Sequence, residues 1–222
     1  IELIGDPSNE GSWARKGLLL GDVQSGKTSN YLAICNKAAD VGYKIIILMT
    51  GTLENLRRQT QERVDEGFTG RNSRDFLKSN PEGKYIGVGF KEKELRRCAI
   101  PFTSIDYDFN KNLLDSLHLG VQDVKEPVIL VVKKNKSVLS NLEDWLKKWC
   151  SSGIDNSRIE YPVLVIDDES DNASVNTSQD SINAINFGIR KILDLFTRSS
   201  YLGVTATPFA NIFINPFDKE DE

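Results

Sequence analysis

The chain has 222 residues, of which 39% are hydrophobic and 27% are charged, a balance typical of a globular protein with a sizeable buried core. Its formal net charge of −4 argues against the broad basic surface of a non-specific DNA-binding protein, although a few loops and helix N-termini can still grip a nucleic-acid backbone. No apolar run is long enough to cross a bilayer and no signal pattern opens the chain, so we expect a cytoplasmic protein.

The cysteine and histidine residues limit the kinds of metal site and catalytic site that the chain can form. The three cysteines, Cys35, Cys98 and Cys150, are widely spaced and have no partners at metal-ligand spacing, which is typical of free thiols in a reducing compartment. His118 is the single histidine and is interpreted as a loop or surface residue, so the sequence nearly excludes histidine-based catalysis and a His-rich metal site.

Apolar runs of strand length alternate with amphipathic helical patterns along the chain. This alternation predicts an α/β fold with a mostly parallel sheet and helices on both faces. In chain order, strands are predicted at 16–20, 45–49, 128–132, 161–166 and 201–204, and helices at 29–41, 53–64, 138–149 and 182–196. We find no repeat and no linker, and expect residues 1–222 to form one domain.

The stretch from 65 to 126 gives a weaker pattern. Residues 85–90 and 98–104 are candidate strands, and the Asn-Pro-Glu-Gly sequence at 80–83 is typical of a turn. Just before this stretch, Thr52 is placed to cap the helix predicted at 53–64.

A strict phosphate-binding loop follows the first predicted strand. The G-x-x-x-x-G-K-T pattern is complete at Gly21, Gly26, Lys27 and Thr28. Its glycines let successive backbone N–H groups face one anion, and the helix that begins near Lys27 adds the positive end of its dipole. We expect Lys27 to reach the β- and γ-phosphates of ATP and the Thr28 hydroxyl to bind Mg²⁺. The predicted phosphate-binding residues are Gly21, Asp22, Val23, Gln24, Ser25, Gly26, Lys27 and Thr28.

A run of acidic residues follows the predicted strand 161–166. Acids at the carboxyl end of a central strand are costly unless a cation lies there, and that end of a parallel sheet is where ligands bind. We expect Asp168 to hold Mg²⁺, directly or through water, and Glu169 to orient and polarise the attacking water. Asp167 is the alternative metal ligand, and a solvated acidic loop is the interpretation without catalysis.

Taken in order, the motifs resemble those of the first RecA-like domain of superfamily two helicases and translocases, a P-loop NTPase fold. Residues 21–28 resemble its motif I, 168–171 its D-E-x-D motif II, and 205–207 its S/T-A-T motif III, with Thr205 and Thr207 as coupling residues. On its own, this last string is a common turn.

Residues 50–59 are similar to motif Ia, in which a helix start faces nucleic acid. Thr50, Thr52 and Gln59 are the candidate contacts implied by this resemblance. The usual Pro-Thr opening is absent, so an ordinary capped helix is the alternative.

A more specific resemblance is to the ATPase portion of Z1 domain proteins, which occur beside DNA methyltransferases and nucleases in bacterial restriction-like defence systems. It is carried by residues 23–28, 131–135 and 166–171 and extends over about 17–215. The resemblance implies an ATP- and Mg²⁺-dependent motor lobe that acts on double-stranded DNA, with nuclease and methyltransferase partners. It also implies a second RecA-like lobe and a Z1 region in cis, which we do not recognise here. Since that second lobe normally supplies the arginine finger, we expect slow hydrolysis by this lobe alone.

Several side chains have two interpretations. Lys133 and Lys134 follow a predicted strand and are candidate contacts for a DNA phosphate or the loops on the nucleotide side, or else a solvated helix start. Trp13 and Arg15 are candidate adenine contacts, or else Trp13 packs on the domain edge. Tyr31 lies at core spacing on the first helix.

The alternative function belongs to a different class. The chain would be a nucleotide-dependent switch or assembly module that binds ATP without translocating on DNA. Hydrolysis that rises with DNA and depends on DNA length would distinguish the motor from the switch.

Overall fold

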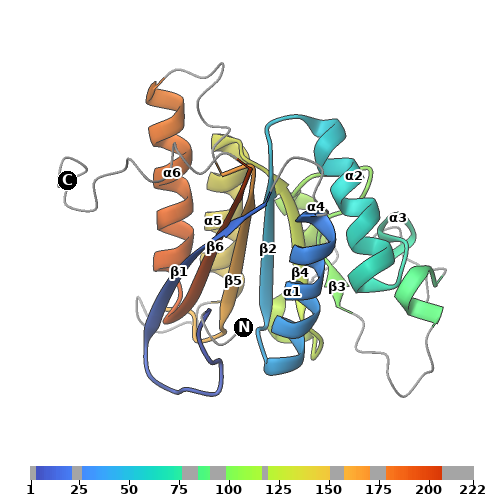
Figure 1. The fold of residues 1–222 in the computed structure, drawn as a ribbon, viewed down its shortest axis with the longest axis horizontal. Coiled ribbons are helices and arrows are strands. Elements are labelled where there is room, and N and C mark those ends of the chain that lie inside the picture. Colours follow the sequence, from blue (N-terminus) through green and yellow to red (C-terminus); the bar gives the residue numbers. More distant parts are fainter. Residues whose placement is uncertain are drawn as a thin grey trace.

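A computed structural model describes residues 4–21, 27–76, 85–90, 99–116, 120–150, 158–170 and 179–206, with the backbone alone at 27, 76, 116, 149–150 and 179–182. Its centre is a six-stranded sheet in which every described pair of neighbouring strands is parallel (Figure 1). The strands are β1 (Trp13–Leu20), β2 (Ile45–Thr50), β3 (Ile100–Pro101), β4 (Val128–Lys133), β5 (Val163–Asp168) and β6 (Arg198–Thr205), in the order β1-β6-β5-β2-β4-β3.

Four longer helices cover the two faces of the sheet (Figure 1). They are α1 (Lys27–Val41), α2 (Glu54–Val64), α5 (Lys136–Cys150) and α6 (Gln179–Asp194), and the short helices α3 (Ser73–Phe76) and α4 (Lys111–Ser116) lie between them in the chain. The middle strands alternate their side chains between two apolar clusters, one beneath α1 and α2 and the other beneath α5 and α6. The fold is therefore a three-layer, Rossmann-like α/β arrangement, which confirms the predicted α/β class with a parallel sheet, while the RecA-like P-loop assignment stays a prediction.

Of the two candidate strands between 65 and 126, the first is wrong and the second is confirmed only in part. Residues Gly87–Phe90 form a short 3₁₀ helix instead of a strand. The cause is close backbone packing, because a Cβ at Gly87 would lie 2.0 Å from the carbonyl oxygen of Glu66, and Gly87 has a φ of +49°. The strand predicted at 98–104 is limited to β3, since the Thr103 hydroxyl accepts the backbone N–H of Val131 and ends the backbone pairing.

The helix α2 also begins differently from the prediction. Its N-cap is Leu53, with no side-chain capping hydrogen bond, and Thr52 is exposed. Thr52 therefore does not cap this helix. Within the described ranges, no helix is both long enough and apolar enough to span a membrane.

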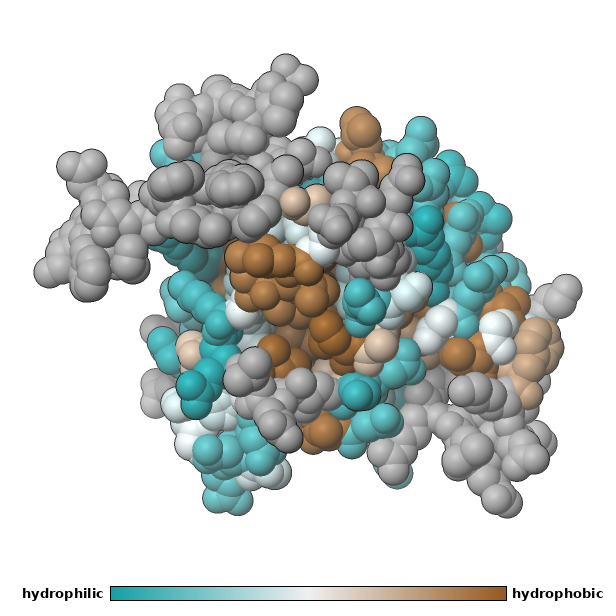
Figure 2. Space-filling model, in the orientation of Figure 1, coloured by the Kyte–Doolittle hydropathy of each residue, from teal (hydrophilic) through white to brown (hydrophobic). Residues whose placement is uncertain are grey.

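Strand β1 lies at the edge of the sheet and leaves apolar side chains uncovered. Leu18 is 43% exposed and Leu20 is 55% exposed. Figure 2 shows hydrophobic residues gathered near the centre of this view, where the ribbon has β1 and β6. The strand that leads into the phosphate loop is thus supported mainly by its pairing with β6.

Helix α2 is attached to the molecule by a polar seam, formed by Arg57, Gln61 and Asp65 at intervals of four residues. All three are fully buried. Arg57 donates to the carbonyl oxygens at 104 and 105, at 2.8 and 3.0 Å. Gln61 donates to Asp65 at 2.9 Å and accepts from Thr103 at 2.8 Å. Buried polar groups that are paired in this way fix orientation, so the seam sets how α2 lies on the molecule.

Because Asp65 in the seam is a buried carboxyl group, we expect the free energy of unfolding to depend on pH. Burial raises the pKa of Asp65 to about 6 from an ordinary value of 3.8, although the N–H of Ser73 and the Gln61 amide both donate to it. Between these two values the folded chain binds more protons at Asp65 than the unfolded chain. Rising pH through this window therefore lowers the free energy of unfolding, by about 2–3 kcal/mol from this group.

In Asp65→Asn we expect this decline between pH 4 and 6 to disappear, measured by urea denaturation at closely spaced pH values. Asp40→Asn, at an exposed position on α1, should keep the wild-type pH dependence. An unchanged pH dependence in Asp65→Asn would contradict the assignment.

Candidate nucleotide site

The carboxyl ends of the parallel strands open on one edge of the sheet. The register aligns Leu20 of β1 with Thr205 of β6, and Val204 of β6 with Asp168 of β5. Strand β6 thus lies between the strand of the phosphate loop and the strand of the carboxylates. Two strand spacings separate β1 from β5 by about 10 Å. The residues that follow these two strands therefore flank a gap above the end of β6.

The described ends of the phosphate loop have the predicted context. The N–H of Gly21 donates to the carbonyl oxygen of Thr205 at 3.1 Å, and α1 begins at Lys27. Residues 22–26 and the Lys27 side chain lie outside the described part. The helix start near Lys27 is confirmed, and the roles of Lys27 and of residues 22–26 stay predictions.

The two neighbouring aspartates at the end of β5 point to opposite faces of the sheet. Asp167 continues the side of Val165 toward α5 and α6, whereas Asp168 continues the side of Ile166 toward α1. Asp168 therefore lies on the face of the helix that follows the phosphate loop. The Tyr201 hydroxyl donates to Asp167 at 2.8 Å on the other face. Of the two candidate metal ligands, the geometry favours Asp168.

The surroundings of Asp168 make its negative charge costly. Burial raises the pKa of Asp168, and the Glu169 carboxylate raises it further, against a 3.1 Å hydrogen bond from the N–H of Glu169. Nearby, the buried hydroxyl of Tyr31 faces Asp168 and the hydroxyls of Thr28 and Thr60. Burial, with the charge of Asp168, raises the pKa of Tyr31 to about 12. A cation beside Asp168 would relieve this repulsion.

A magnesium ion fits this donor set. Mg²⁺ keeps several waters and is commonly bound by one or two protein oxygens together with substrate phosphates. Thr28 on α1 and Asp168 on β5 supply such oxygens, and both interact with Tyr31. Across the described ranges, no group of three or more His, Cys, Asp or Glu forms a dedicated metal cage. Two oxygens of this kind suit a metal that arrives with a phosphate ligand.

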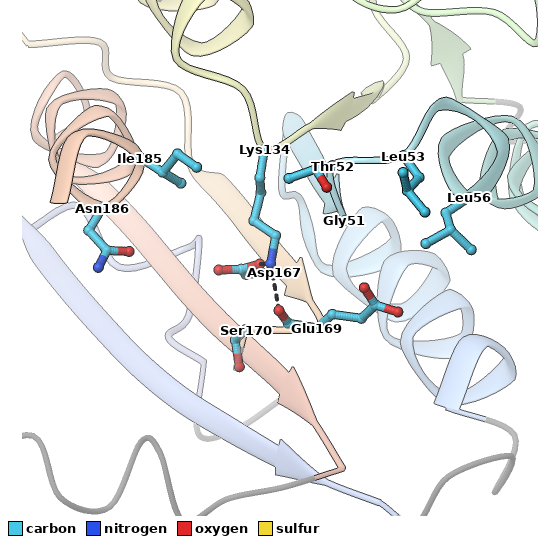
Figure 3. A pocket seen from close by; sticks show the side chains of 10 residues that line it. All are labelled: Gly51, Thr52, Leu53, Leu56, Lys134, Asp167, Glu169, Ser170, Ile185 and Asn186. Atoms are coloured by element: carbon cyan, nitrogen blue, oxygen red, sulfur yellow. Dashed lines mark hydrogen bonds and ion pairs between the residues drawn. The ribbon is translucent and has the colours of Figure 1, made fainter. Parts of the chain in front are cut away.

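A buried lysine holds the turn that carries the carboxylates. The side chains of Lys134 and Asp167 are 8% and 6% exposed, with 2.9 Å between Nζ and Oδ1. Lys134 also donates to the carbonyl oxygens of Asp168 at 3.0 Å and Glu169 at 2.6 Å. Figure 3 shows Lys134 reaching across from the end of β4 to this turn. The ammonium group thus makes two hydrogen bonds to backbone carbonyl oxygens and an ion pair with Asp167, whose Oδ1 accepts no hydrogen bond among the described residues.

Glu169 adopts a backbone conformation that is unfavourable for its residue type. Its φ is +57°, in the left-handed region, and the Lys134 bond to its carbonyl oxygen supports that conformation. Its carboxylate lies over Gly51, where an added Cβ would be 2.7 Å from Oε2. A cavity of about 110 Å³ lies beside it, lined by Gly51, Leu53, Leu56, Glu169, Ser170 and Asn186 among others (Figure 3). Glu169 thus borders open space next to the strand ends.

The remaining predicted site residues are dispersed. Thr50 is buried and donates to the carbonyl oxygen of Val132 at 3.3 Å, and Thr205 is buried beside Gly21. Thr52 and Gln59 are exposed near the start of α2, so their contact with DNA stays a prediction. Thr207 lies outside the described residues.

The interpretation of the two lysines as a solvated helix start is wrong for Lys134, which is buried, whereas Lys133 ends β4 and is partly exposed. Lys133 is paired with Glu54 at 2.8 Å and faces Asp108 at 3.8 Å, while Lys134 is buried. Trp13 packs edge-on against Tyr43, with ring centroids 6.1 Å apart, at the end of β1 opposite Gly21. The packing interpretation of Trp13 is therefore confirmed.

The bonds of Lys134 to the turn at 168–169 agree with the predicted contact to the loops on the nucleotide side. Two other interactions in the site have no counterpart in the sequence predictions. One is the buried ion pair of Lys134 with Asp167, for which the available signal is a lysine and an acidic run at the ends of strands that meet at one edge. The other is a hydrogen bond of 2.9 Å from Arg63 of α2 to the hydroxyl of Thr28. Nothing in the local sequence of either residue indicates that contact.

Comparisons of the chain with protein-family models, with curated proteins and with solved structures found no match. The function is therefore inferred from the motifs and from the residues that meet at this edge of the sheet.

The buried ion pair between Lys134 and Asp167 should contribute to the stability of the fold. Lys134→Met removes one partner of a buried ion pair and leaves Asp167 buried with its charge unpaired by Lys134. We expect the free energy of unfolding to fall by about 3–5 kcal/mol. Lys134→Met combined with Asp167→Asn should recover much of this loss, because no buried charge is then left without its partner. Urea denaturation measures both effects.

Lys136→Met, at an exposed position on α5, is the matched control and should change stability little. An equal free energy of unfolding for Lys134→Met and Lys136→Met would show that the ion pair does not stabilise the fold.

Proposed function

We propose that this chain binds ATP with Mg²⁺ and hydrolyses it, as the first RecA-like lobe of a helicase-like ATPase. One observation carries the proposal. The complete G-x-x-x-x-G-K-T motif and the Asp168-Glu169 pair follow strands separated only by β6, and Asp168 faces the helix that begins at Lys27. A chance glycine turn would not be expected to precede a helix on the same face of the sheet as a half-buried carboxylate.

Each residue has a distinct task in the proposed reaction. The backbone N–H groups of the loop and the N-terminus of α1 bind phosphate oxygens, with Lys27 placed to reach the β- and γ-phosphates. Bound Mg²⁺ would neutralise charge on those oxygens, and Thr28 and Asp168 would hold it. Glu169 orients and polarises the attacking water from the rim of the cavity. Lys134 keeps the Asp168-Glu169 turn in place.

The order of the motifs supports the motor interpretation. The strings at 21–28, 50–59, 168–171 and 205–207 follow the order of motifs I, Ia, II and III of superfamily two ATPases, and 131–135 adds the similarity to Z1 domain proteins. We propose that the chain works with a second RecA-like lobe and a Z1 region on double-stranded DNA, in a restriction-type defence system with nuclease and methyltransferase partners.

A specific observation favours a second candidate, the nucleotide-dependent switch. Both lysines expected to meet DNA are engaged by acids, Lys133 by Glu54 and Lys134 by Asp167. A module that binds ATP and exchanges protein partners needs no DNA-facing lysines. Hydrolysis by the purified protein that rises with DNA, and rises further with DNA length, would select the motor. Hydrolysis indifferent to DNA would select the switch.

Substitution of the two principal residues tests nucleotide chemistry itself. Lys27→Ala should weaken ATP binding by about tenfold to a hundredfold, because it removes a charge-assisted contact with the phosphates. Glu169→Gln should bind ATP normally but turn over about 10²–10⁴-fold more slowly, because the amide cannot accept the proton of water. Equilibrium binding and phosphate release measure the two effects.

Lys37→Ala on the exposed side of α1 and Glu160→Gln before β5 are the controls, and both should behave as wild type. Wild-type turnover in Glu169→Gln would remove the assigned role of that carboxylate.

Gly51→Ala tests the position of the Glu169 carboxylate. The new methyl group would meet Oε2 of Glu169, which is the movable end of a side chain, so the fold should tolerate it while the carboxylate shifts. We expect turnover to fall by about tenfold to a hundredfold with ATP affinity unchanged. Gly11→Ala, in the exposed turn before β1, should leave both unchanged. Equal turnover in the two variants would argue against a positional role for Gly51.

A further inference from the structure

Arg63 reaches the candidate metal ligand from a neighbouring helix. It lies in the last turn of α2, and its Nη1 donates to the Thr28 hydroxyl at 2.9 Å. Thr28 is one residue into the helix that follows the phosphate loop, 35 positions away in the chain. The side chain of Arg63 is exposed at this point, so it is accessible to a ligand that enters the site.

Arg63 belongs to one electrostatic group with Thr28, Tyr31 and Asp168. The buried Tyr31 hydroxyl faces Thr28 and Asp168, and the charge of Arg63 acts on it as well. These side chains come from α1, α2 and the end of β5. A positive guanidinium and a half-buried carboxylate thus both lie near the hydroxyls at the start of α1.

The helix that carries Arg63 is held in place independently of this contact. Arg57, Gln61 and Asp65 fix the buried side of α2 through the polar seam. Arg63 projects from the opposite, exposed side. Its long side chain can therefore exchange partners while the helix stays where it is.

We propose that Arg63 is a phosphate-binding residue supplied in cis, which holds the Thr28 hydroxyl in the nucleotide-free protein and moves to triphosphate oxygens when ATP and Mg²⁺ bind. This inference rests on the proposed function. A hydroxyl that accepts a guanidinium N–H offers a poorer lone pair to a metal, and the two cations repel each other. Anionic phosphate oxygens are stronger acceptors for a guanidinium than a neutral hydroxyl, and can be bound in a bidentate manner. Arrival of the nucleotide therefore favours the exchange.

With Arg63 in this role, part of the positive charge around the phosphates comes from this chain itself. The family resemblance implies an arginine from a second lobe, whereas Arg63 comes from this chain. Its partner class is a nucleoside di- or triphosphate, because a monophosphate lacks the β- and γ-oxygens that face Lys27 and Thr28 in the proposed binding mode.

The test compares Arg63→Ala with Arg58→Ala, an exposed arginine on the same helix, in the purified protein with Mg²⁺. Equilibrium binding is measured for a non-hydrolysable ATP analogue, ADP and AMP. We expect Arg63→Ala to weaken binding of the ATP analogue by about tenfold to a hundredfold, with no change for AMP. Arg63→Lys should recover part of the loss, since it restores charge without the planar fork. Arg58→Ala should match wild type.

The possible results distinguish a failure of the Arg63 role from a failure of the proposed function. If wild type binds the ATP analogue and Lys27→Ala weakens it, but Arg63→Ala binds as Arg58→Ala does, the role of Arg63 is overturned and the proposed function stands. If wild type binds none of the three nucleotides, the proposed function falls and the role of Arg63 falls with it. Equal losses for ATP analogue and AMP would also overturn the phosphate contact.

Discussion

The ion pair between Lys134 and Asp167 is the interaction on which the candidate site depends. Burying an ammonium group and a carboxylate costs several kcal/mol per ion, which only good geometry and additional hydrogen bonds offset. Here Lys134 adds hydrogen bonds to the carbonyl oxygens of Asp168 and Glu169, and the Tyr201 hydroxyl donates to Asp167. The interaction thus joins the end of β4 to the end of β5 and fixes the turn that presents both proposed catalytic carboxylates.

Because side chains alternate along β5, Asp167 contributes to the fold while Asp168 faces the candidate nucleotide site. Asp167 points to the face of α5 and α6, where Lys134 and Tyr201 engage it. Asp168, one residue later, points to the face of α1. Two adjacent residues of the same type therefore differ in role because a strand turns successive side chains to opposite faces. The charge on Asp167 is compensated internally, whereas burial and Glu169 leave the charge on Asp168 suited to an external cation.

The sequence predicts those features that arise from residues close together in the chain better than those that depend on contacts between distant segments. Local signals sufficed for the strands of the central sheet, their helices and the helix start at Lys27, since periodicity and the glycine motif are contained in short windows. Residues 85–90 mimic a strand, but their glycines pack on the backbone at Glu66, a contact between distant segments. The Lys134–Asp167 ion pair and the Arg63–Thr28 bond likewise join segments whose proximity only the topology creates.

Helix α2 is the element that relates nucleotide chemistry to the rest of the molecule. Its first turn is tied to β4 through Glu54 and Lys133, and Leu53 and Leu56 line the cavity beside Glu169. Its last turn reaches Thr28 through Arg63. Because the polar seam holds its buried side, a displacement at one end would be carried by the whole helix rather than absorbed in a loop. A motor and a switch both need such an element, so this architecture explains why the two proposed functions share one nucleotide site.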